Sequence, residues 1–329
     1  QLIYLRNKVN SGKSYNGEYF RLDADLDMAG KTFGDAIGNT QNYSPSNFNG
    51  HFDGNHHKIS NLTIGNANGY SALFGNVGWN NQEVVIKNLI LVNVNVNRTS
   101  TNYGAAALVG NAGYLKLENC TVESGTVQTN SYTAGGFVAN AGAYNAISLT
   151  IIDCVNKANI TQTSSIGNGA GGIVGQGCNQ SGNGNTTITG CINYGDVSGR
   201  SYAAGIIGNA YVATIEKCAN YGDISAIGTS SGTFEKTAKA AGILVSGADK
   251  VTTIENCYNV GNISSNGTTP YGSSSMNAGG AAGIAAFNSS SSVQKTITNC
   301  HNVGTVTSDY GYPIGLRSKS IANAFYLNM

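Results

Sequence analysis

Short apolar runs recur along the chain, and their pattern predicts β-strands rather than helices. Each run is a few residues long, is rich in Ile, Val and Thr, and ends at Gly or Asn, as in Thr252-Thr253-Ile254-Glu255-Asn256. Such runs are typical of strands, and no stretch between them sustains the 3.6-residue apolar period of an amphipathic helix. The sequence therefore favours parallel strands with no helices covering them.

One four-residue segment returns throughout the chain, and we call its copies the Ile-x-Asn-Cys column. The copies begin at Ile59, Ile86, Leu117, Ile151, Ile188, Ile215, Ile254, Ile297 and Ile321. Their intervals vary, which a solenoid tolerates when one loop in each turn changes length. Because parallel crossovers are right-handed in nearly all proteins, we predict an all-β, right-handed parallel β-helix of about nine coils.

A second apolar repeat, such as Gly172-Ile173-Val174-Gly175, predicts at least two short strands in every coil. We expect the variable loop between a strand ending near Ile160 or its equivalents and this second strand. In the later coils Asn stands two positions after the cysteine and Gly four positions after it, as in Asn220 and Gly222. Both residue types accept positive φ, so both are expected at a chain reversal, and stacked Asn amides can form a ladder.

The N-terminal segment follows a different pattern. Leu2, Leu5 and Val9 have near-helical spacing, whereas residues 19–28 alternate apolar and polar side chains. We predict a capping helix and then a first strand, because an uncovered end coil exposes unpaired strand edges. Residues 1–50 are thus assigned to the cap and first coil, and residues 51–329 to the β-helix coils, in one continuous domain. The C-terminus shows no comparable cap.

Composition restricts the partners. Only 11% of the residues are charged, the net charge is +1, and Gly fills 45 positions. Without a basic run there is no electrostatic footprint for nucleic acid or anionic lipid. No apolar stretch approaches the roughly 18 residues of a membrane-spanning helix, so we expect no membrane insertion within this chain.

A family resemblance adds to this interpretation. The stretch Phe52-Asp53-Gly54-Asn55-His56-His57-Lys58-Ile59-Ser60-Asn61-Leu62, followed by Leu73-Phe74-Gly75 and Ile86-Lys87-Asn88-Leu89, resembles the opening of the GLUG-motif family of bacterial cell-surface proteins. The later Gly-Gly-Ile-Val-Gly and Asn-Cys-x-Asn-x-Gly segments resemble its repeats, and the similarity covers nearly the whole chain. His56 departs from the family, which usually has Gly there. The resemblance implies a secreted or surface-anchored, adhesin-like protein, and it implies no catalytic residues or cofactor.

Six of the seven cysteines stand in the Ile-x-Asn-Cys column. Parallel, in-register side chains rarely reach disulfide geometry, so we expect free thiols that act as small apolar fillers of the interior. Cys178 lies outside the column and is predicted to be the exposed thiol.

Two clusters of Asp and His residues are candidate metal sites. Asp23, Asp25 and Asp27 share one side of the first predicted strand, and the second cluster contains His51, Asp53, His56 and His57. Neither has the ligand spacing of a dedicated calcium loop or zinc site, so we expect a solvated outer face and no bound metal.

The candidate ligand-binding residues are Tyr194, Tyr221, Asp196 and Asp223, because they repeat within Asn-Tyr-Gly-Asp on adjacent coils. The coil spacing places the two carboxylates near the separation that retaining glycosidases use. Glu216 and Glu255 form another such pair, so stacked acidic residues occur more than once in this chain. We therefore expect Asp196 and Asp223 to lie in an exposed turn rather than in a catalytic site. Two stacked rings beside them would offer a sugar contact area and hydroxyl groups.

Three functions remain open. The first is a monomeric, extracellular or cell-surface adhesin-like module that binds a glycan or a surface protein without catalysis. It is favoured by Tyr-bearing loops, whose rings are Tyr103, Tyr132, Tyr144, Tyr202, Tyr211 and Tyr271. The second is a polysaccharide hydrolase or lyase, and the third is a structural stalk.

Overall fold

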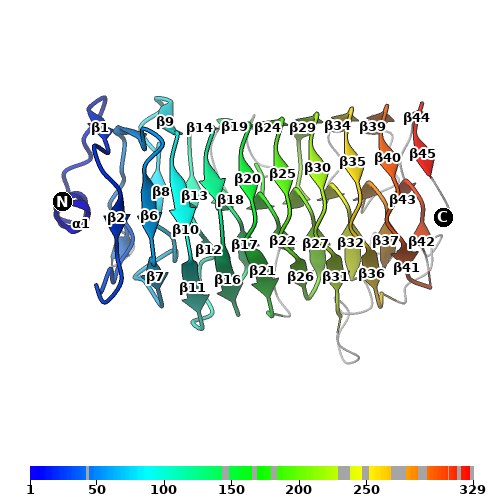
Figure 1. Cartoon of the computed structure of the whole chain (residues 1–329), viewed down its shortest axis with the longest axis horizontal. Coiled ribbons are helices and arrows are strands. Elements are labelled where there is room, and N and C mark those ends of the chain that lie inside the picture. Colours follow the sequence, from blue (N-terminus) through cyan, green and yellow to red (C-terminus); the bar gives the residue numbers. More distant parts are fainter. Residues whose placement is uncertain are drawn as a thin grey trace.

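The chain is a parallel β-helix whose coils stack along one axis (Figure 1). A computed structural model describes residues 1–41, 44–142, 148–164, 169–178, 184–228, 238–246, 252–267, 279–287, 295–309, 311–316 and 320–326. In these residues a typical coil contains five short strands, one in each of five parallel sheets that we call A to E in the order the chain meets them. The sequence predicted at least two strands in each coil, and a typical coil has five.

Sheet A contains the strands that end at the Ile-x-Asn-Cys column. They are β1 (Tyr19–Arg21), β5 (His51–Asp53), β9 (Val84–Lys87), β14 (Leu115–Glu118), β19 (Ser148–Ile152), β24 (Asn185–Thr189), β29 (Ala213–Glu216), β34 (Thr252–Glu255), β39 (Lys295–Thr298) and β44 (Ser320–Ala322). Sheet B follows directly. It contains β2 (Leu26–Asp27), β6 (Lys58–Ser60), β10 (Ile90–Val92), β15 (Thr121–Val122), β20 (Val155–Asn156), β25 (Ile192–Asn193), β30 (Ala219–Asn220), β35 (Tyr258–Asn259), β40 (His301–Asn302) and β45 (Phe325–Tyr326).

The other three sheets complete each coil. Sheet C contains β7 (Thr63–Ile64), β11 (Val94–Arg98), β16 (Gly125–Thr129), β21 (Asn159–Gln162), β26 (Val197–Gly199), β31 (Ile224–Ala226), β36 (Ile263–Ser265) and β41 (Val306–Thr307). Sheet D contains β12 (Ala105–Ala106), β17 (Thr133–Gly135), β22 (Gly169–Gly171), β27 (Tyr202–Ala204), β32 (Lys239–Ala241), β37 (Gly280–Ala282) and β42 (Gly311–Tyr312). Sheet E contains β8 (Phe74–Val77), β13 (Val109–Ala112), β18 (Val138–Ala141), β23 (Val174–Gln176), β28 (Ile207–Ala210), β33 (Leu244–Ser246), β38 (Ala285–Phe287) and β43 (Gly315–Leu316).

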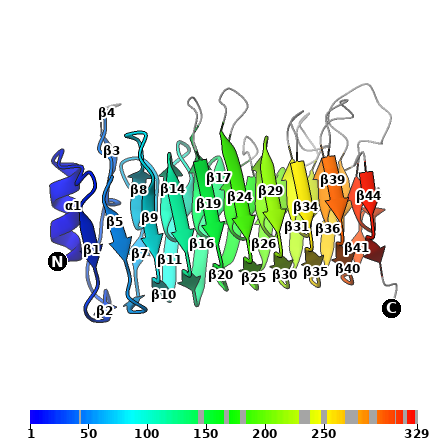
Figure 2. The same ribbon diagram turned by 90° about the horizontal axis from the view of Figure 1, so that it is seen from above.

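The N-terminal cap is present as predicted. Helix α1 (Leu2–Asn10) buries Leu2, Leu5 and Val9 against the first coil, and it lies beside β1 at one end of the stack (Figures 1 and 2). The alternating segment 19–28 is not one strand, because it turns a corner and divides into β1 and β2 of two different sheets. A short antiparallel pair, β3 (Thr40–Gln41) and β4 (Ser44–Pro45), follows.

One member of the Ile-x-Asn-Cys column was assigned wrongly. Ile59 pairs with Leu91 in sheet B, whereas the residues in register with Ile86 in sheet A are Phe52 and then Phe20. The first coils therefore use Phe where the later ones use Ile or Leu, and sheets A and B each have ten strands among the described residues. The apolar spacing around Ile59 fits either sheet, so the pattern alone did not separate them.

The frequent Asn at the third position of the Ile-x-Asn-Cys column is explained by the backbone conformation there. Asn88, Asn119, Asp153, Gly190, Lys217, Asn256, Asn299 and Asn323 all have φ between +49° and +69°. They form the corner between sheets A and B, which requires the left-handed region that Asn tolerates better than most residues. His56 lies in the same left-handed region, with φ of +62°.

The glycines four positions after the cysteines do not have the positive φ that the sequence predicted; they are needed because neighbouring coils leave no room for a side chain. A Cβ atom on Gly222 would lie 2.0 Å from the carbonyl oxygen of Gly195 on the preceding coil. Gly205 in the second apolar repeat lies equally close to the side chain of Asn220, where an added Cβ would approach Cγ to 2.3 Å. Glycine is needed at both places because the coils and the Asn column approach too closely for any side chain.

The interior is a continuous apolar core with the cysteines in it. All seven cysteines are buried and free of disulfides. The prediction that Cys178 is exposed was wrong: it is completely buried, and its backbone N–H donates to Thr186 Oγ1 at 2.9 Å. Burial raises the pKa of Cys154, Cys218 and Cys257, which makes them poor nucleophiles in the folded protein.

Candidate functional site

A buried ladder of Asn side chains fixes the corner that carries the candidate residues. The ladder consists of Asn156, Asn193, Asn220, Asn259 and Asn302, all fully buried. Each amide nitrogen in the first four donates to the Oδ1 of the next Asn at 2.7–2.8 Å. Each of the five also donates to the backbone carbonyl two residues further on, as Asn220 does to Gly222 at 2.8 Å. The loop from sheet B to sheet C is therefore held in the same conformation on successive coils.

Tyr194 and Tyr221 stack on the outer side of this corner, as the sequence predicted. Their ring centroids are 4.8 Å apart and their planes differ by 11°. The rings are 46% and 37% exposed, which leaves their outer edges and part of their faces to solvent. Each ring faces the other, so a ligand on this side meets ring edges, hydroxyl groups and only part of a face.

A third ring completes the group, which we call the tyrosine cluster: Tyr194, Tyr221 and Tyr258. The Tyr258 ring is 5.6 Å from that of Tyr221 and perpendicular to it at 89°, and the two hydroxyl oxygens are 2.5 Å apart. This hydrogen bond, more than desolvation, raises the pKa of Tyr258 to about 12. The repeat pattern did not indicate Tyr258, because this residue directly follows its cysteine and so occupies a different column from Tyr194 and Tyr221. An aromatic residue at an outward position of sheet B was the available signal.

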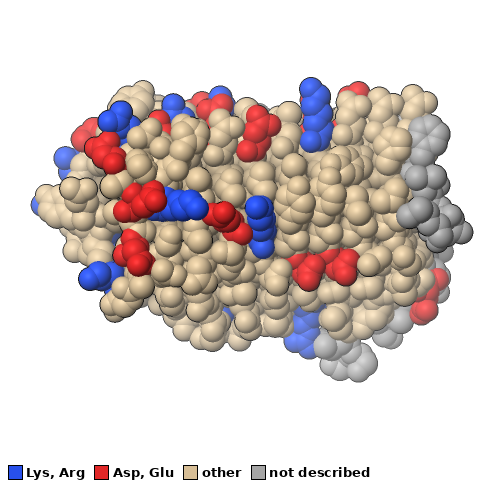
Figure 3. All heavy atoms as spheres, in the orientation of Figure 1, with Lys and Arg blue, Asp and Glu red and all other residues tan. Residues whose placement is uncertain are grey.

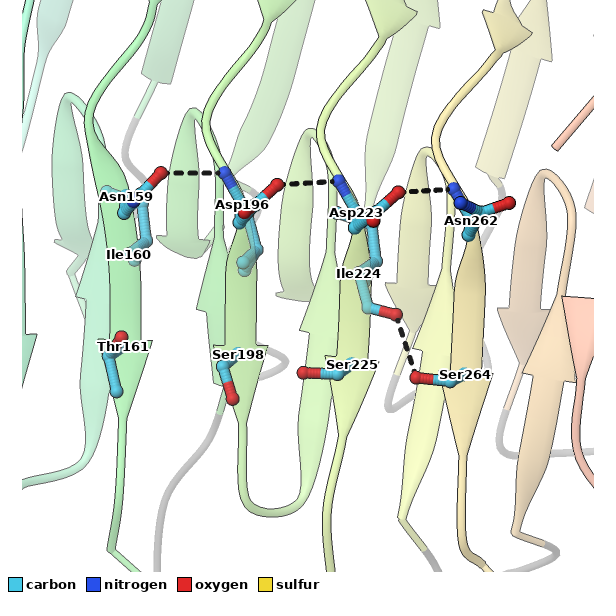
Figure 4. A pocket seen from close by; sticks show the side chains of 11 residues that line it. Asn159, Ile160, Thr161, Asp196, Ser198, Asp223, Ile224, Ser225, Asn262 and Ser264 are labelled. Atoms are coloured by element: carbon cyan, nitrogen blue, oxygen red, sulfur yellow. Dashed lines mark hydrogen bonds between the residues drawn. The ribbon is translucent and has the colours of Figure 1, made fainter. Parts of the chain in front are cut away.

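Asp196 and Asp223 lie on adjacent coils as predicted, but they belong to a longer polar column (Figure 4). Asn159 Oδ1 accepts a hydrogen bond from the Asp196 backbone N–H at 3.0 Å, and Asp196 Oδ1 accepts one from Asp223 N–H at 2.9 Å. Asp223 Oδ1 accepts the next from Asn262 N–H at 2.8 Å. The two carboxylates therefore do the same structural work as the amides before and after them.

A shallow groove of about 310 Å³ runs along the outer face of sheet C beside this column. One side is formed by the polar column, and the other by residues two positions later on the same strands. That second row is Thr161, Ser198, Ser225 and Ser264. Asp196 and Asp223 are the charged members of the lining. The tyrosine cluster is not part of the lining, but Tyr194 and Tyr221 precede these two Asp residues by two positions.

The surface around these features is mostly neutral. Figure 3 shows one face of the molecule, on which charged residues are sparse and lie mainly over the N-terminal half. Glu216 and Glu255 are paired in register on sheet A, so the second stacked acid pair is present as predicted. Such a surface produces no strong electrostatic field.

The other predicted clusters do not converge. Asp23 pairs with Arg21 at 2.9 Å and Asp25 with His57 at 2.9 Å, while Asp27 accepts a hydrogen bond from Asn61 at 2.8 Å. Hydrogen bonds from the Lys58 backbone and the His57 side chain lower the pKa of Asp25. His51 stacks on Tyr19 with ring centroids 4.4 Å apart. Across the described residues, no three His, Cys, Asp or Glu side chains are arranged to hold a metal ion.

The remaining tyrosines give a mixed result. Tyr103 packs against Tyr70 at 5.3 Å, and Tyr202 belongs to strand β27 rather than to a loop. Tyr132 is 39% exposed and lies between strands β16 and β17. Tyr144 and Tyr271 lie outside the described residues.

In the part of the chain that the structure describes, no helix is long and apolar enough to cross a membrane.

Comparison with known proteins adds a fold relationship. No protein-family profile matches the chain, and no curated protein matches it. A crystal structure of a candidate immunoglobulin A1 protease from Bacteroides ovatus is similar, with a TM-score of 0.63 and 22% sequence identity. The match covers 87% of this chain and 82% of that one. At 22% identity the similarity shows a shared fold only, and the protease activity named for the other protein is not transferred to this chain.

Proposed function

We propose that this chain is a bacterial, secreted or surface-displayed β-helix that binds carbohydrate without catalysing a reaction. The tyrosine cluster is the observation that carries the proposal. Three partly exposed rings lie on successive coils next to a polar groove, and the Tyr221 ring is 4.8 Å from that of Tyr194 and 5.6 Å from that of Tyr258. Exposed aromatic groups on a rigid scaffold supply contact area at little entropic cost, and neighbouring hydroxyl and amide groups suit sugar hydroxyls.

The secreted location and the GLUG-type, adhesin-like character are part of this proposal and rest on the motifs from Phe52 to Leu89. The sparse charge and the neutral polar surface are consistent with them. A monomer is expected, because the described strands pair within the chain along the whole stack.

Catalysis by Asp196 and Asp223 is the weaker alternative. In each residue Oδ1 accepts a backbone hydrogen bond from the next coil, and Asn159 does the same in the same column. An amide cannot act as a nucleophile or general acid, yet Asn159 accepts the same bond, so the hydrogen bonds of this column give no support for catalysis.

The test begins with a glycan array, followed by calorimetry on any sugar that binds. Tyr221→Ala should weaken binding about fivefold or more, because it removes a ring in contact with both others. Tyr132→Ala is the matched control, since Tyr132 has a similar exposure of 39% but no ring contact among the described residues. Equal effects of the two substitutions would refute a site at the cluster. No binding to any glycan would favour the stalk, and release of reducing sugar that Asp223→Asn abolishes would establish an enzyme.

A further inference from the structure

The groove on sheet C repeats with the coils, and this repeat constrains what fits it. Each of four successive strands presents one carboxylate or amide at the corner and one hydroxyl two residues later. Neighbouring coils are about 4.8 Å apart, and residues two apart on a strand are about 6.6 Å apart. The groove is therefore a strip of like polar sites along the helix axis. In an extended β-linked oligosaccharide the advance per sugar is comparable to that coil spacing, and successive sugars are turned over, so equivalent groups alternate between the two sides of the chain.

The two carboxylates are not required by the fold. Asn159 accepts the backbone hydrogen bond of the next coil at 3.0 Å, as Asp196 does at 2.9 Å, so an amide is sufficient in this column. Two Asp residues on adjacent coils instead introduce like-charge repulsion, which is unfavourable between directly opposed side chains. Their negative charge is thus an addition to the structural role.

The charge of the two carboxylates restricts which sugars would fit this groove. Asp196 and Asp223 are exposed, and no Lys or Arg is among the lining residues. In each, Oδ1 takes part in the polar column, while Oδ2 accepts no hydrogen bond from the described residues. An ammonium group can therefore approach Oδ2 without displacing a structural bond, whereas a uronic acid would be repelled.

We propose that the groove binds a linear oligosaccharide of amino sugars along the helix axis, with one sugar on each of the four lining coils. This inference rests on the proposed carbohydrate-binding function and names its ligand class. One ammonium group lies beside Asp196 and Asp223, hydroxyl groups lie beside the Thr and Ser row, and the tyrosine cluster bounds the ligand on the sheet B side.

The experiment is calorimetry with β-linked glucosamine oligomers of increasing length, with N-acetylglucosamine and galacturonic acid oligomers of equal length in parallel. Affinity for glucosamine oligomers should rise to about four sugars, one per lining coil, and then level off. These oligomers should bind at least about tenfold more tightly than the galacturonic acid oligomers and should weaken as salt is raised. The salt titration uses the unmodified protein, so it does not depend on any variant folding.

The double variant Asp196→Asn/Asp223→Asn tests the carboxylates. Because Asn already occupies this column on the flanking coils, the variant should keep its melting temperature and lose about tenfold or more in affinity for glucosamine oligomers. Glu216→Gln/Glu255→Gln, which neutralises the other stacked pair, is the matched control and should bind like the parent protein.

The outcomes separate the two proposals. If the Asn variant keeps its preference for amino sugars, if affinity does not depend on length, or if galacturonic acid oligomers bind equally well, the ligand assignment is overturned. The carbohydrate-binding function survives each of these results provided that Tyr221→Ala still weakens binding of some glycan. If no sugar binds the parent protein, both proposals fail.

Discussion

The Asn ladder allows a quantitative prediction about stability. Asn220→Ala removes three hydrogen bonds: those donated to Gly222 O at 2.8 Å and to Asn259 Oδ1 at 2.7 Å, and the one accepted from Asn193 at 2.8 Å. Asn193 keeps its bond to Gly195 O, whereas the two acceptors lose a buried donor. At about 1 kcal/mol for each lost bond, plus the cost of unsatisfied buried acceptors, the free energy of unfolding should fall by about 2–4 kcal/mol.

Two further variants make the comparison sharp. Asn302 donates to Gly304 O at 2.9 Å and accepts from Asn259 at 2.7 Å, so Asn302→Ala breaks two hydrogen bonds instead of three and should cost less. Asn97→Ala on the exposed side of β11 should change stability by less than about 0.5 kcal/mol. Urea unfolding followed by circular dichroism measures all three. A cost for Asn220→Ala no larger than that for Asn97→Ala would refute the argument that the ladder holds the corner.

Three other predictions concern the core, the thiols and the cap. Ile254→Ala should lower the free energy of unfolding, measured by urea unfolding, by about 2–5 kcal/mol because Ile254 is fully buried. Thr253→Ala, at a half-buried position on the same strand, is the control and should cost far less. The loop residue Ser273 lies outside the described residues. All seven thiols should resist alkylation in the native protein and react after denaturation; rapid native labelling of Cys178 would contradict its burial. Because burial raises the pKa of thiols such as Cys154 and Cys257, the unfolded chain loses those protons first, and stability should fall as the pH rises above about 8.5. Deleting residues 1–28 should give oligomers in light scattering, since it removes α1, β1 and β2 and uncovers the edge of the next coil; a monomeric product would count against the capping role.

The repeat alone determined the architecture, because residues one coil apart in a solenoid become neighbours in space. A column read from the sequence is therefore a column in the structure, as Ile151, Ile188, Ile215 and Ile254 show in sheet A. The same rule placed the six column cysteines inside, the Asn side chains in a ladder, and both the Asp pair and the Tyr194–Tyr221 pair on adjacent coils.

Tertiary structure decided what lies between the columns. Tyr258 joins Tyr221 from a different column because a long side chain reaches across the sheet, which no periodicity reports. Cys178 is buried because the chain beyond β23 packs against Thr186 at the start of β24, and Ile59 belongs to sheet B because the bend at Gly54 to His57 comes before it rather than after it. Spacing along the chain specifies which residues are equivalent, whereas corner geometry and side-chain reach determine which non-equivalent residues meet.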